Sequence, residues 1–557
     1  MYCDKDNVNI LTALLAAHGI RHAVVCPGSR NAPIVHNLKE CQQIECHPVT
    51  DERSAGFYAL GLALATASPV AVCVTSGSAL LNVVPAAAEA FYRHVPIIII
   101  SADRPAQWIG QLDGQTMPQT GALGCFVRKA VCLPEPANDE QRWMCNRLVN
   151  EAISTASIHG CGPVHINVPI SEPLFSFTTP CLPNERIFTV EPTATLIVSL
   201  ENIKDELANY RRIITVIGQT WKGDIDDTLF ALISRDNVLM AEPLSNSSDS
   251  SIHPDETVRA VGDDPDCSPD LVIYLGGTVV SKRVRHYLRR VAAPTWLLTV
   301  DGYDMPDPTM NLTKIIECCS WQQLDELLNR IYLATALQQT TFSQKWHNAM
   351  KAADQHAHTF VPTFSQMETV KTFEEEIEAN GTMAHIHYAN STAIRLANIY
   401  ARHYVWCNRG LNGIEGSLST AAGFSLATGD KVFCVIGDLS FFYDQNALWN
   451  TGLRGNLRIL LLNNRCGGIF KSLPGLEKSD AADDFVAATH HTDARGTCRQ
   501  NNIVYIEAHD SESMKKGVRQ LINEPSERPM LLEVFTDADE DSHIIGEYLR
   551  MCTSLRG

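Results

Sequence analysis

The chain has no excess of basic side chains. Its 557 residues include 45 lysines and arginines against 63 aspartates and glutamates, a formal net charge of −18. Proteins that bind nucleic acids or anionic membrane surfaces usually present a basic face, so we expect neither kind of partner. No apolar run approaches the roughly 18 residues that a membrane-spanning helix needs. Stretches such as residues 95–100 and 459–462 have the length of strands, and we expect no membrane insertion.

Motifs of several common enzyme classes are missing as well. The sequence has no C-x-x-C pair, no H-E-x-x-H zinc motif, no G-x-x-x-x-G-K-[ST] phosphate loop and no G-x-S-x-G nucleophile elbow. These absences argue against zinc sites, nucleotide hydrolases and serine hydrolases. The 18 cysteines form no regular framework, and the first residues do not resemble a secretory signal. We therefore expect reduced thiols in a cytoplasmic protein.

The chain contains three stretches in which short β-branched runs alternate with segments of helical period. The expected strands are 23–26, 70–75 and 96–101, then 213–217, 271–275 and 296–300, and finally 385–388, 432–436 and 459–462. This pattern predicts an α/β protein of three consecutive doubly wound domains with parallel sheets. The expected domains are residues 1–182, 190–345 and 360–557, and residues 336–380 read as a polar, helix-prone connecting segment.

The most informative segment begins at the strand expected over 432–436. Gly437-Asp438-Leu439-Ser440 follows this strand and opens a helix expected to reach about residue 453. The next strand is followed by Asn463-Asn464. Because the two strands are parallel, Asp438 and Asn464 are expected at the same edge of the sheet, where α/β proteins bind ligands. A carboxylate and an amide oxygen beside a helix start suit Mg²⁺ and a diphosphate.

This spacing, with Asn464 26 residues after Asp438, resembles the motif of thiamine-diphosphate-dependent enzymes of the pyruvate oxidase and decarboxylase group. That family joins a pyrimidine-binding, a central and a diphosphate-binding domain, in the order of the three stretches. It also requires a glutamate in its first domain, which Glu52 matches, just before a helix expected over 54–66. The resemblance implies that Glu52 binds the aminopyrimidine ring and promotes the proton transfer that activates the cofactor. Taken alone, Glu52 is an ordinary carboxylate at a helix start.

Further motifs narrow the resemblance. They occupy residues 26–33, 75–79, 101–105 and 114–115 in the first stretch, and residues 390–395, 408–416, 419–423 and 468–474 in the third. Together they resemble the 2-succinyl-5-enolpyruvyl-6-hydroxy-3-cyclohexene-1-carboxylate (SEPHCHC) synthases of menaquinone biosynthesis. These enzymes decarboxylate 2-oxoglutarate on thiamine diphosphate and add the succinyl-semialdehyde unit to isochorismate.

Both of those substrates are dicarboxylates, so such a site needs several cations, preferably arginine forks. The positions that match the family motifs are Arg30, Arg104, Lys282, Arg395 and Arg409. The resemblance also implies hydrogen bonds to substrate or intermediates from Ser29, Gln115 and Ser391, and an apolar wall of Ile469, Phe470 and Leu473. The implied catalytic set is Glu52, Ser29, Arg30, Gln115, Arg395 and Arg409. Any one of these arginines, taken alone, reads as an ordinary surface residue.

For the cofactor, the resemblance implies contacts from Glu52, Ile414, Gly437, Asp438, Leu439, Ser440 and Asn464. Ile414 is the bulky residue that holds the cofactor in its bent shape. Mg²⁺, or Mn²⁺ in its place, takes Asp438, Asn464 and the backbone carbonyl of Cys466. Cys466 stands where this family usually has glycine, and a cysteine there must avoid a positive φ or accept strain. Phe441 and Phe442 are bulkier than the family pattern leads us to expect, and we assign them only to packing.

Some alternatives remain open from the sequence. A related thiamine-diphosphate carboligase that uses pyruvate would need fewer cations, and a non-catalytic paralogue would act as a binding module. The segment around His490 and His491 reads as a mobile lid rather than a metal site. In this family the glutamate and the diphosphate site come from different chains, so the resemblance implies a homodimer or homotetramer.

Overall fold

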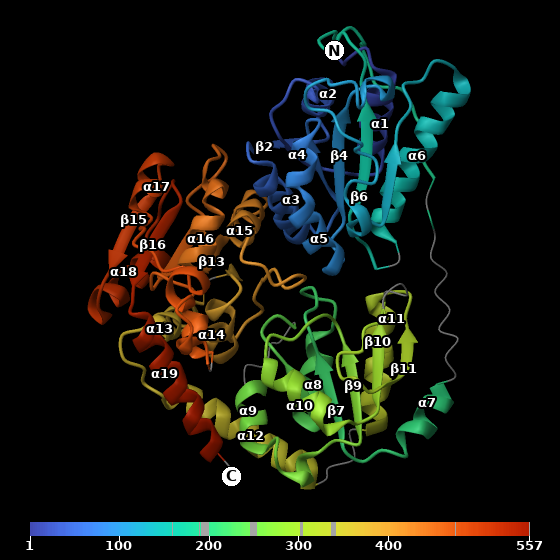
Figure 1. The fold of residues 1–557 in the computed structure, drawn as a ribbon. Helices are drawn as coiled ribbons and strands as arrows, with labels where there is room; N and C mark the ends of the chain where they lie inside the picture. The colour runs from blue at the N-terminus through green and yellow to red at the C-terminus, as the bar shows by residue number, and fades with distance from the viewer. Residues whose placement is uncertain are drawn as a thin grey trace.

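The computed structural model describes residues 1–158, 160–188, 190, 200–245, 253–300, 305–335, 341–381, 383–473 and 475–555. Three parallel β-sheets follow one another along the chain, each with helices packed against it, and they appear in Figure 1 in blue to cyan, green to yellow, and orange to red. The predicted α/β architecture of three parallel-sheet units is therefore confirmed. None of the helices in the described ranges is long and apolar enough to cross a membrane.

The first sheet has the strand order β2-β1-β3-β4-β6-β5. Its strands are β1 (His22–Val25), β2 (Glu45–Pro48), β3 (Val70–Val74), β4 (Ile97–Asp103), β5 (Lys129–Cys132) and β6 (Val164–Pro169). The helices of this part are α1 (Asp6–Ala17), α2 (Ala32–Glu40), α3 (Glu52–Thr66), α4 (Ser78–Asn82), α5 (Val84–Tyr92) and α6 (Asp139–Ser157). All of the paired strands are parallel, so the ends of β1, β3 and β4 meet at one edge.

The central sheet has the order β11-β10-β9-β7-β8. Its strands are β7 (Ile213–Ile217), β8 (Val238–Ala241), β9 (Leu271–Leu275), β10 (Thr295–Thr299) and β11 (Leu312–Glu317). The helices are α7 (Leu200–Leu207), α8 (Asp227–Asp236), α9 (Pro254–Val261), α10 (Lys282–Val291) and α11 (Trp321–Thr335).

The third sheet has the order β12-β13-β14-β16-β15. Its strands are β12 (Ala384–Tyr388), β13 (Lys431–Gly437), β14 (Leu457–Asn463), β15 (Val504–Ala508) and β16 (Met530–Phe535). The helices are α13 (Gln366–Asn380), α14 (Thr392–Tyr400), α15 (Ser417–Leu426), α16 (Asp438–Tyr443), α17 (Arg495–Gln500), α18 (Ser511–Asn523) and α19 (Ala538–Met551). Strands β13 and β14 are neighbours, which brings the residues after them to the same edge.

The segment after β3 forms two helices, α4 and α5, which are divided at Val83, two residues before Pro85. One predicted helix differs from the observed one. The helix that opens at Asp438 ends at Tyr443, ahead of the expected residue 453. Asp444 is fully buried there and accepts hydrogen bonds from the backbone and the hydroxyl of Ser419, so the chain turns inward at this point.

The connecting segment is helical, as predicted, but it also packs against the sheets. Helix α12 (Thr341–Thr359) buries Trp346 in a core beside the central sheet, and α13 buries Phe373 in a core of the third sheet. Residues 336–340 of the predicted segment lie outside the described residues.

Helices α3 and α15 join the first sheet to the third and lie side by side in Figure 1. Both have a glycine at the crossing. A Cβ on Gly61 would lie 2.0 Å from the Thr420 carbonyl oxygen, and a Cβ on Gly423 would lie 2.3 Å from the Tyr58 backbone carbonyl oxygen. The Tyr58 hydroxyl donates a hydrogen bond to the Ala447 carbonyl at 2.5 Å. This close backbone contact fixes the first and third sheets relative to each other.

Candidate active site

Five of the sequence-predicted residues lie after strands of the first sheet or at the start of one of its helices. Ser29 and Arg30 follow β1, Arg104 follows β4, and Glu52 is the first residue of α3. Gln115 has φ 57°, and its backbone lies against Gly77, which follows β3. Because β1, β3 and β4 are adjacent parallel strands, the predicted residues lie at the carboxyl edge of the sheet, where ligands bind in α/β folds.

Glu52 is half-buried in the first turn of α3. Asp51 caps this helix by accepting hydrogen bonds from the backbone N–H groups of Arg53 and Ser54. Glu52 is therefore not needed as the cap. Its side-chain partner is Asn82, whose Nδ2 donates a hydrogen bond to Glu52 Oε2 at 3.3 Å. This carboxylate is consequently held only lightly by the protein and is available to a bound group.

The two predicted arginines of this edge differ in how far they are engaged. Arg30 is buried and donates to the Ile170 carbonyl at 3.0 Å and to Glu172 at 2.9 Å. Arg104 is half-buried, and its guanidinium lies 3.8 Å from Asp113. The Arg30 fork is thus already occupied on one side, whereas Arg104 forms only a long ion pair.

The second group of predicted residues lies at the edge of the third sheet. Asp438 is buried, and its Oδ1 accepts a hydrogen bond from the backbone N–H of Leu439 at 2.7 Å. Its Oδ2 is buried without a hydrogen-bond partner. A buried carboxylate oxygen without a partner is costly, so this atom fits a cation site.

Asn464 is oriented by a neighbouring carboxylate. Its Nδ2 donates to Asp541 Oδ2 at 3.0 Å, which leaves the amide oxygen free to act as a ligand. A Cβ on Gly468 would lie 2.6 Å from this Nδ2, so glycine is required where the backbone passes the amide. Asp438 and Asn464 together provide the hard oxygen donors that Mg²⁺ prefers, and the residues present fit this metal.

The loop after Asn464 accommodates cysteine at the family's glycine position. The positive φ of this loop falls on Arg465 (66°), and Cys466 is not among the residues with positive φ. The Cys466 carbonyl accepts a hydrogen bond from the Gly468 N–H at 2.9 Å. Burial raises the pKa of the Cys466 thiol to about 11, so the thiol is neutral near pH 7, and the Cys466 carbonyl is the harder oxygen donor of the two.

The predicted lid segment lies against this edge. His490 Nε2 is 3.4 Å from Asp438 Oδ2, and the His490 ring packs edge-on against Phe442 with centroids 5.5 Å apart. Phe441 is fully buried in the core between the first and third sheets. Both phenylalanines therefore have packing roles, and the mobility of the histidine segment stays a prediction.

The third group consists of basic side chains that lie between the central and third sheets. Arg409 is buried and donates to Asn390 Oδ1 at 2.9 Å, and Asn390 directly precedes Ser391, the residue before α14. Desolvation and the nearby charge of Arg409 lower the pKa of Arg395, which indicates that these two cations lie close together. Lys282 is exposed at the start of α10, beside Ser281, whose N–H is bound by the buried Glu242.

The predicted apolar wall follows the metal loop. Ile469 and Phe470 belong to a short 3-10 helix, Gly468–Ser472, and are half-buried, whereas Leu473 after it is exposed. Ile414 is exposed in the loop before α15. The Pro474 of the motif lies outside the described residues.

Glu52 makes no direct contact with the predicted metal ligands. In the described parts of the structure, no hydrogen bond or ion pair joins Glu52 to Asp438 or Asn464. A cavity of about 1710 Å³ between the first and central sheets is lined by Arg409, Gly410 and Arg285, but not by Glu52 or Asp438. The residues on either side of Glu52 do reach the chain that follows Asp438, since Arg53 Nη2 donates to the Tyr443 carbonyl at 2.6 Å and Asn446 Nδ2 donates to Asp51 at 2.7 Å.

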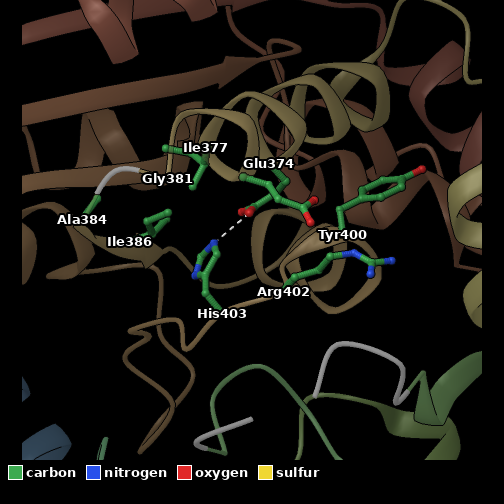
Figure 2. A pocket seen from close by; sticks show the side chains of 9 residues that line it. Glu374, Ile377, Gly381, Ala384, Ile386, Tyr400, Arg402 and His403 are labelled. Carbon is green, nitrogen blue, oxygen red and sulfur yellow. Dashed lines mark hydrogen bonds and ion pairs between the residues drawn. The ribbon is translucent and has the colours of Figure 1, made fainter. Parts of the chain in front are cut away.

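A smaller cavity of about 230 Å³ beside β12 contains none of the predicted residues. Figure 2 shows the His403 ring pointing at the Glu374 carboxylate, 2.7 Å away. Burial lowers the pKa of His403, but the charge and hydrogen bond of Glu374 outweigh it and raise the pKa overall. Its other ring nitrogen lies 3.1 Å from the Tyr404 carbonyl. Both nitrogens are engaged, so this cavity is a poorer candidate.

Sequence reasoning missed the residues that hold the site from outside it. Asp541 orients Asn464, Glu242 binds the backbone before Lys282, and Glu89 binds the backbone after Arg409. Asp541, Glu242 and Glu89 lie outside the recognised motifs. Each one binds a residue far away in the sequence, so no local pattern points to it. Asn390 lies in the motif of residues 390–395, directly before Ser391, and this position is the signal from which it could be found.

Comparisons with known proteins agree with this geometry. The family model described as thiamine pyrophosphate enzyme, N-terminal TPP binding domain, matches residues 6–123, and that for the C-terminal TPP binding domain matches residues 388–534. SEPHCHC synthases from Phocaeicola vulgatus and Bacteroides fragilis are each 41% identical to this chain, over 98% of it and over 98% and 99% of their own lengths. The synthase from Porphyromonas gingivalis is 33% identical over 98% of this chain and 97% of its own. The chain belongs to the SEPHCHC synthase family of thiamine-pyrophosphate enzymes.

Proposed function

We propose that this protein catalyses the thiamine-diphosphate-dependent decarboxylation of 2-oxoglutarate and the 1,4-addition of the resulting unit to isochorismate, giving SEPHCHC and CO₂ for menaquinone biosynthesis. The observation that carries the proposal is the 41% identity to synthases of this name over 98% of the chain. The retained Glu52, Asp438 and Asn464, placed at strand ends or a helix start, support it.

The chain's own residues have distinct tasks in this proposal. When bound, thiamine diphosphate supplies the electron sink that allows a 2-oxo acid to lose CO₂. Glu52 holds a proton at the cofactor's pyrimidine, for which its lightly held carboxylate is suited. Ile414 would support the bound cofactor, and Gly437, Asp438, Leu439 and Ser440 would hold its diphosphate.

Substrate carboxylates are the partners that we assign to the cations. The set is Arg30, Arg104, Lys282, Arg395 and Arg409, with hydrogen bonds from Ser29, Gln115 and Ser391. The mutual proximity of Arg395 and Arg409 supports this assignment, because two adjacent cations favour an anion between them. Ile469, Phe470 and Leu473 exclude water from the reacting end, where low polarity favours loss of a charged carboxyl group.

Mg²⁺, with Mn²⁺ as a substitute, is the metal that we propose for Asp438, Asn464 and the Cys466 carbonyl. Asp438→Asn removes the charge and should weaken Mg²⁺-dependent binding of thiamine diphosphate at least tenfold in a calorimetric titration. The exposed Asp480→Asn is the matched control. Unchanged affinity in Asp438→Asn would remove this residue from the metal site.

We further propose a homodimer or homotetramer, because the resemblance implies that the glutamate and the diphosphate site come from different chains. The division into residues 1–182, 190–345 and 360–557 also stays a proposal, and both family models fall inside the outer two parts. None of the 18 cysteines forms a disulfide bond, which supports the proposed cytoplasmic location.

The test is isochorismate consumption by protein loaded with thiamine diphosphate and Mg²⁺, with 2-oxoglutarate or pyruvate as the donor. We expect consumption with 2-oxoglutarate and a kcat/KM at least 100-fold lower with pyruvate, which lacks the second carboxylate. Preference for pyruvate would favour a related carboligase. A folded, cofactor-loaded protein that consumes no isochorismate would contradict the proposal.

A further inference from the structure

The segment that carries Arg409 has no helix or strand of its own. Between the bridge at Trp406 and the start of α15 at Ser417 the chain is irregular. Buried backbone groups need hydrogen-bond partners, and here side chains from other elements supply them. What holds this segment therefore also sets the position of Arg409.

Glu89, on helix α5 of the first sheet, binds two successive amides of the segment. Its Oε1 accepts from the Gly410 N–H at 2.9 Å, and its Oε2 accepts from the Leu411 N–H at 2.8 Å. Glu89 is 3% exposed. Burial raises the pKa of Glu89, while Arg93 and the two amides oppose this change. The carboxylate thus meets both N–H groups directly after Arg409.

Arg93, the residue that follows the last residue of α5, binds the other side of the same segment. Its Nη1 donates to the Cys407 carbonyl at 2.8 Å, and Gln219 of the central part donates to the same carbonyl at 2.8 Å. We call Glu89 and Arg93 the α5 clamp. It grips the backbone on both sides of residues 408 and 409.

The segment is shaped to fit the clamp. A Cβ on Gly410 would lie 2.9 Å from both the Glu89 carbonyl oxygen and its Oε2. From the third sheet, Asn390 Nδ2 donates to the Asn408 carbonyl at 2.6 Å and to the Gly413 carbonyl at 2.7 Å, and Asn390 Oδ1 accepts from Arg409. The α5 clamp and the side-chain amide of Asn390 together restrict the backbone conformation around Arg409.

We propose that Glu89 and Arg93 are positioning residues for Arg409, so that recognition of a substrate carboxylate depends on a helix of the first sheet. This inference rests on the proposed function for the ligand of Arg409. The clamp itself is independent of that ligand. The clamp reaches substrate only through Arg409.

Glu89→Gln is the direct test, because glutamine keeps the shape but turns an NH₂ group toward one of the two amides. We expect faster hydrogen exchange at Gly410 and Leu411, a fall of at least tenfold in kcat/KM, and less than a threefold change in affinity for thiamine diphosphate. Glu374→Gln is the matched control: Glu374 is equally buried, with hydrogen bonds to Tyr388 and His403 instead. Exchange at residues 410–411 that matches the wild type would overturn the clamp.

A double-mutant cycle separates positioning from general support of the fold. In the Arg409→Lys background, Glu89→Gln should lower kcat/KM less than threefold, because the residue that it positions is already compromised. The same factor in both backgrounds would overturn the inference. If Glu89→Gln does not fold, Gly410→Ala disturbs the clamp from the other side and should give the same pattern. Wild-type protein without activity on isochorismate would contradict the proposed function and leave the exchange test valid.

Discussion

At the scale of single residues, Glu52 combines a helix-start position with few partners. Glu52→Gln should lower kcat at least 100-fold, because the carboxyl group is assigned the proton at the cofactor. The free energy of unfolding should change by less than about 1 kcal/mol, since the side chain is half-buried and its hydrogen bond from Asn82 is long. Steady-state kinetics and urea unfolding measure the two effects, with the exposed Glu45→Gln as control. Turnover within threefold of the wild type would remove Glu52 from this role.

His165 predicts a specific pH dependence of stability. It is fully buried on β6, with Nε2 2.8 Å from the Ser101 hydroxyl, and burial lowers its pKa to about 4. Between pH 6.5 and 4 the unfolded chain binds more protons here than the folded chain, so stability falls as the pH falls. The contribution lost between pH 7 and pH 5 is about 2 kcal/mol.

His165→Gln keeps a partner for Ser101 and should remove this loss. The free energy of unfolding, taken from the first transition of a urea titration at pH 7 and at pH 5, is compared between the wild type and the variant. His491→Gln, at an exposed position, should keep the wild-type slope. An identical pH slope in His165→Gln would contradict the assignment.

A site residue could be predicted from the sequence when it follows a recognisable strand, and not when its role depends on a hydrogen-bond partner far away in the chain. Asp438 and Asn464 could be located because both follow strands whose apolar runs are evident and adjacent. The outcome at Cys466 could not be foreseen, since the loop shifts its positive φ to Arg465. Glu89 and Asp541 could not be predicted either, because each acts on a backbone or amide group far away in the sequence.

At the scale of elements, the contact of α3 with α15 depends on Gly61. A methyl group there meets backbone atoms, 2.0 Å from the Thr420 oxygen and 2.7 Å from the Phe424 nitrogen, which cannot move independently. Gly61→Ala should therefore cost about 3 kcal/mol or more. In Gly546→Ala, on α19, the nearest atom is a side-chain nitrogen of Arg550 4.0 Å away, and a gain of about 0.5–1 kcal/mol is expected. Thermal unfolding distinguishes the two signs, and equal effects would contradict the packing argument.

The elements that the sequence analysis did not foresee are chiefly edge strands. The nine predicted strands each lie within two residues of an observed one. Seven of the described strands are missed: the edge strands β2, β5, β8, β11 and β15, and the interior strands β6 and β16. Of these, β2 and β5 carry polar or charged residues in Glu45–Pro48 and Lys129–Cys132, as is common in edge strands, which are covered on fewer sides. Periodicity alone does not separate such strands from loops.

At the scale of the whole molecule, the assembly makes a prediction about mixed subunits. If Glu52 of one copy serves the metal site of another, a dimer of Glu52→Gln with Asp438→Ala has one intact site of two. Co-expression with random pairing makes about half of the dimers mixed, so about a quarter of wild-type activity should return. Each variant alone should remain nearly inactive. No recovery in mixed dimers, verified by differential tags, would place the whole site within one chain.

The net charge of −18 describes the molecule as a whole, and the proposed site has the opposite character. The assigned cations lie after strands or near helix starts, where they meet anionic ligands, and the acidic remainder covers the rest of the surface. The net charge therefore does not argue against the proposed binding of two dicarboxylates and a diphosphate, because a few cations at one place are enough to meet them.

The most direct test of the proposed activity is the stoichiometry of the complete reaction. Protein loaded with thiamine diphosphate and Mg²⁺ is given isochorismate and 2-oxoglutarate labelled with ¹³C at its C1 carboxyl, and isochorismate loss and labelled CO₂ are followed together. The account predicts one labelled CO₂ for each isochorismate consumed, and neither without the cofactor. Labelled CO₂ released at the full rate without isochorismate loss, or no release from cofactor-saturated protein, would contradict it.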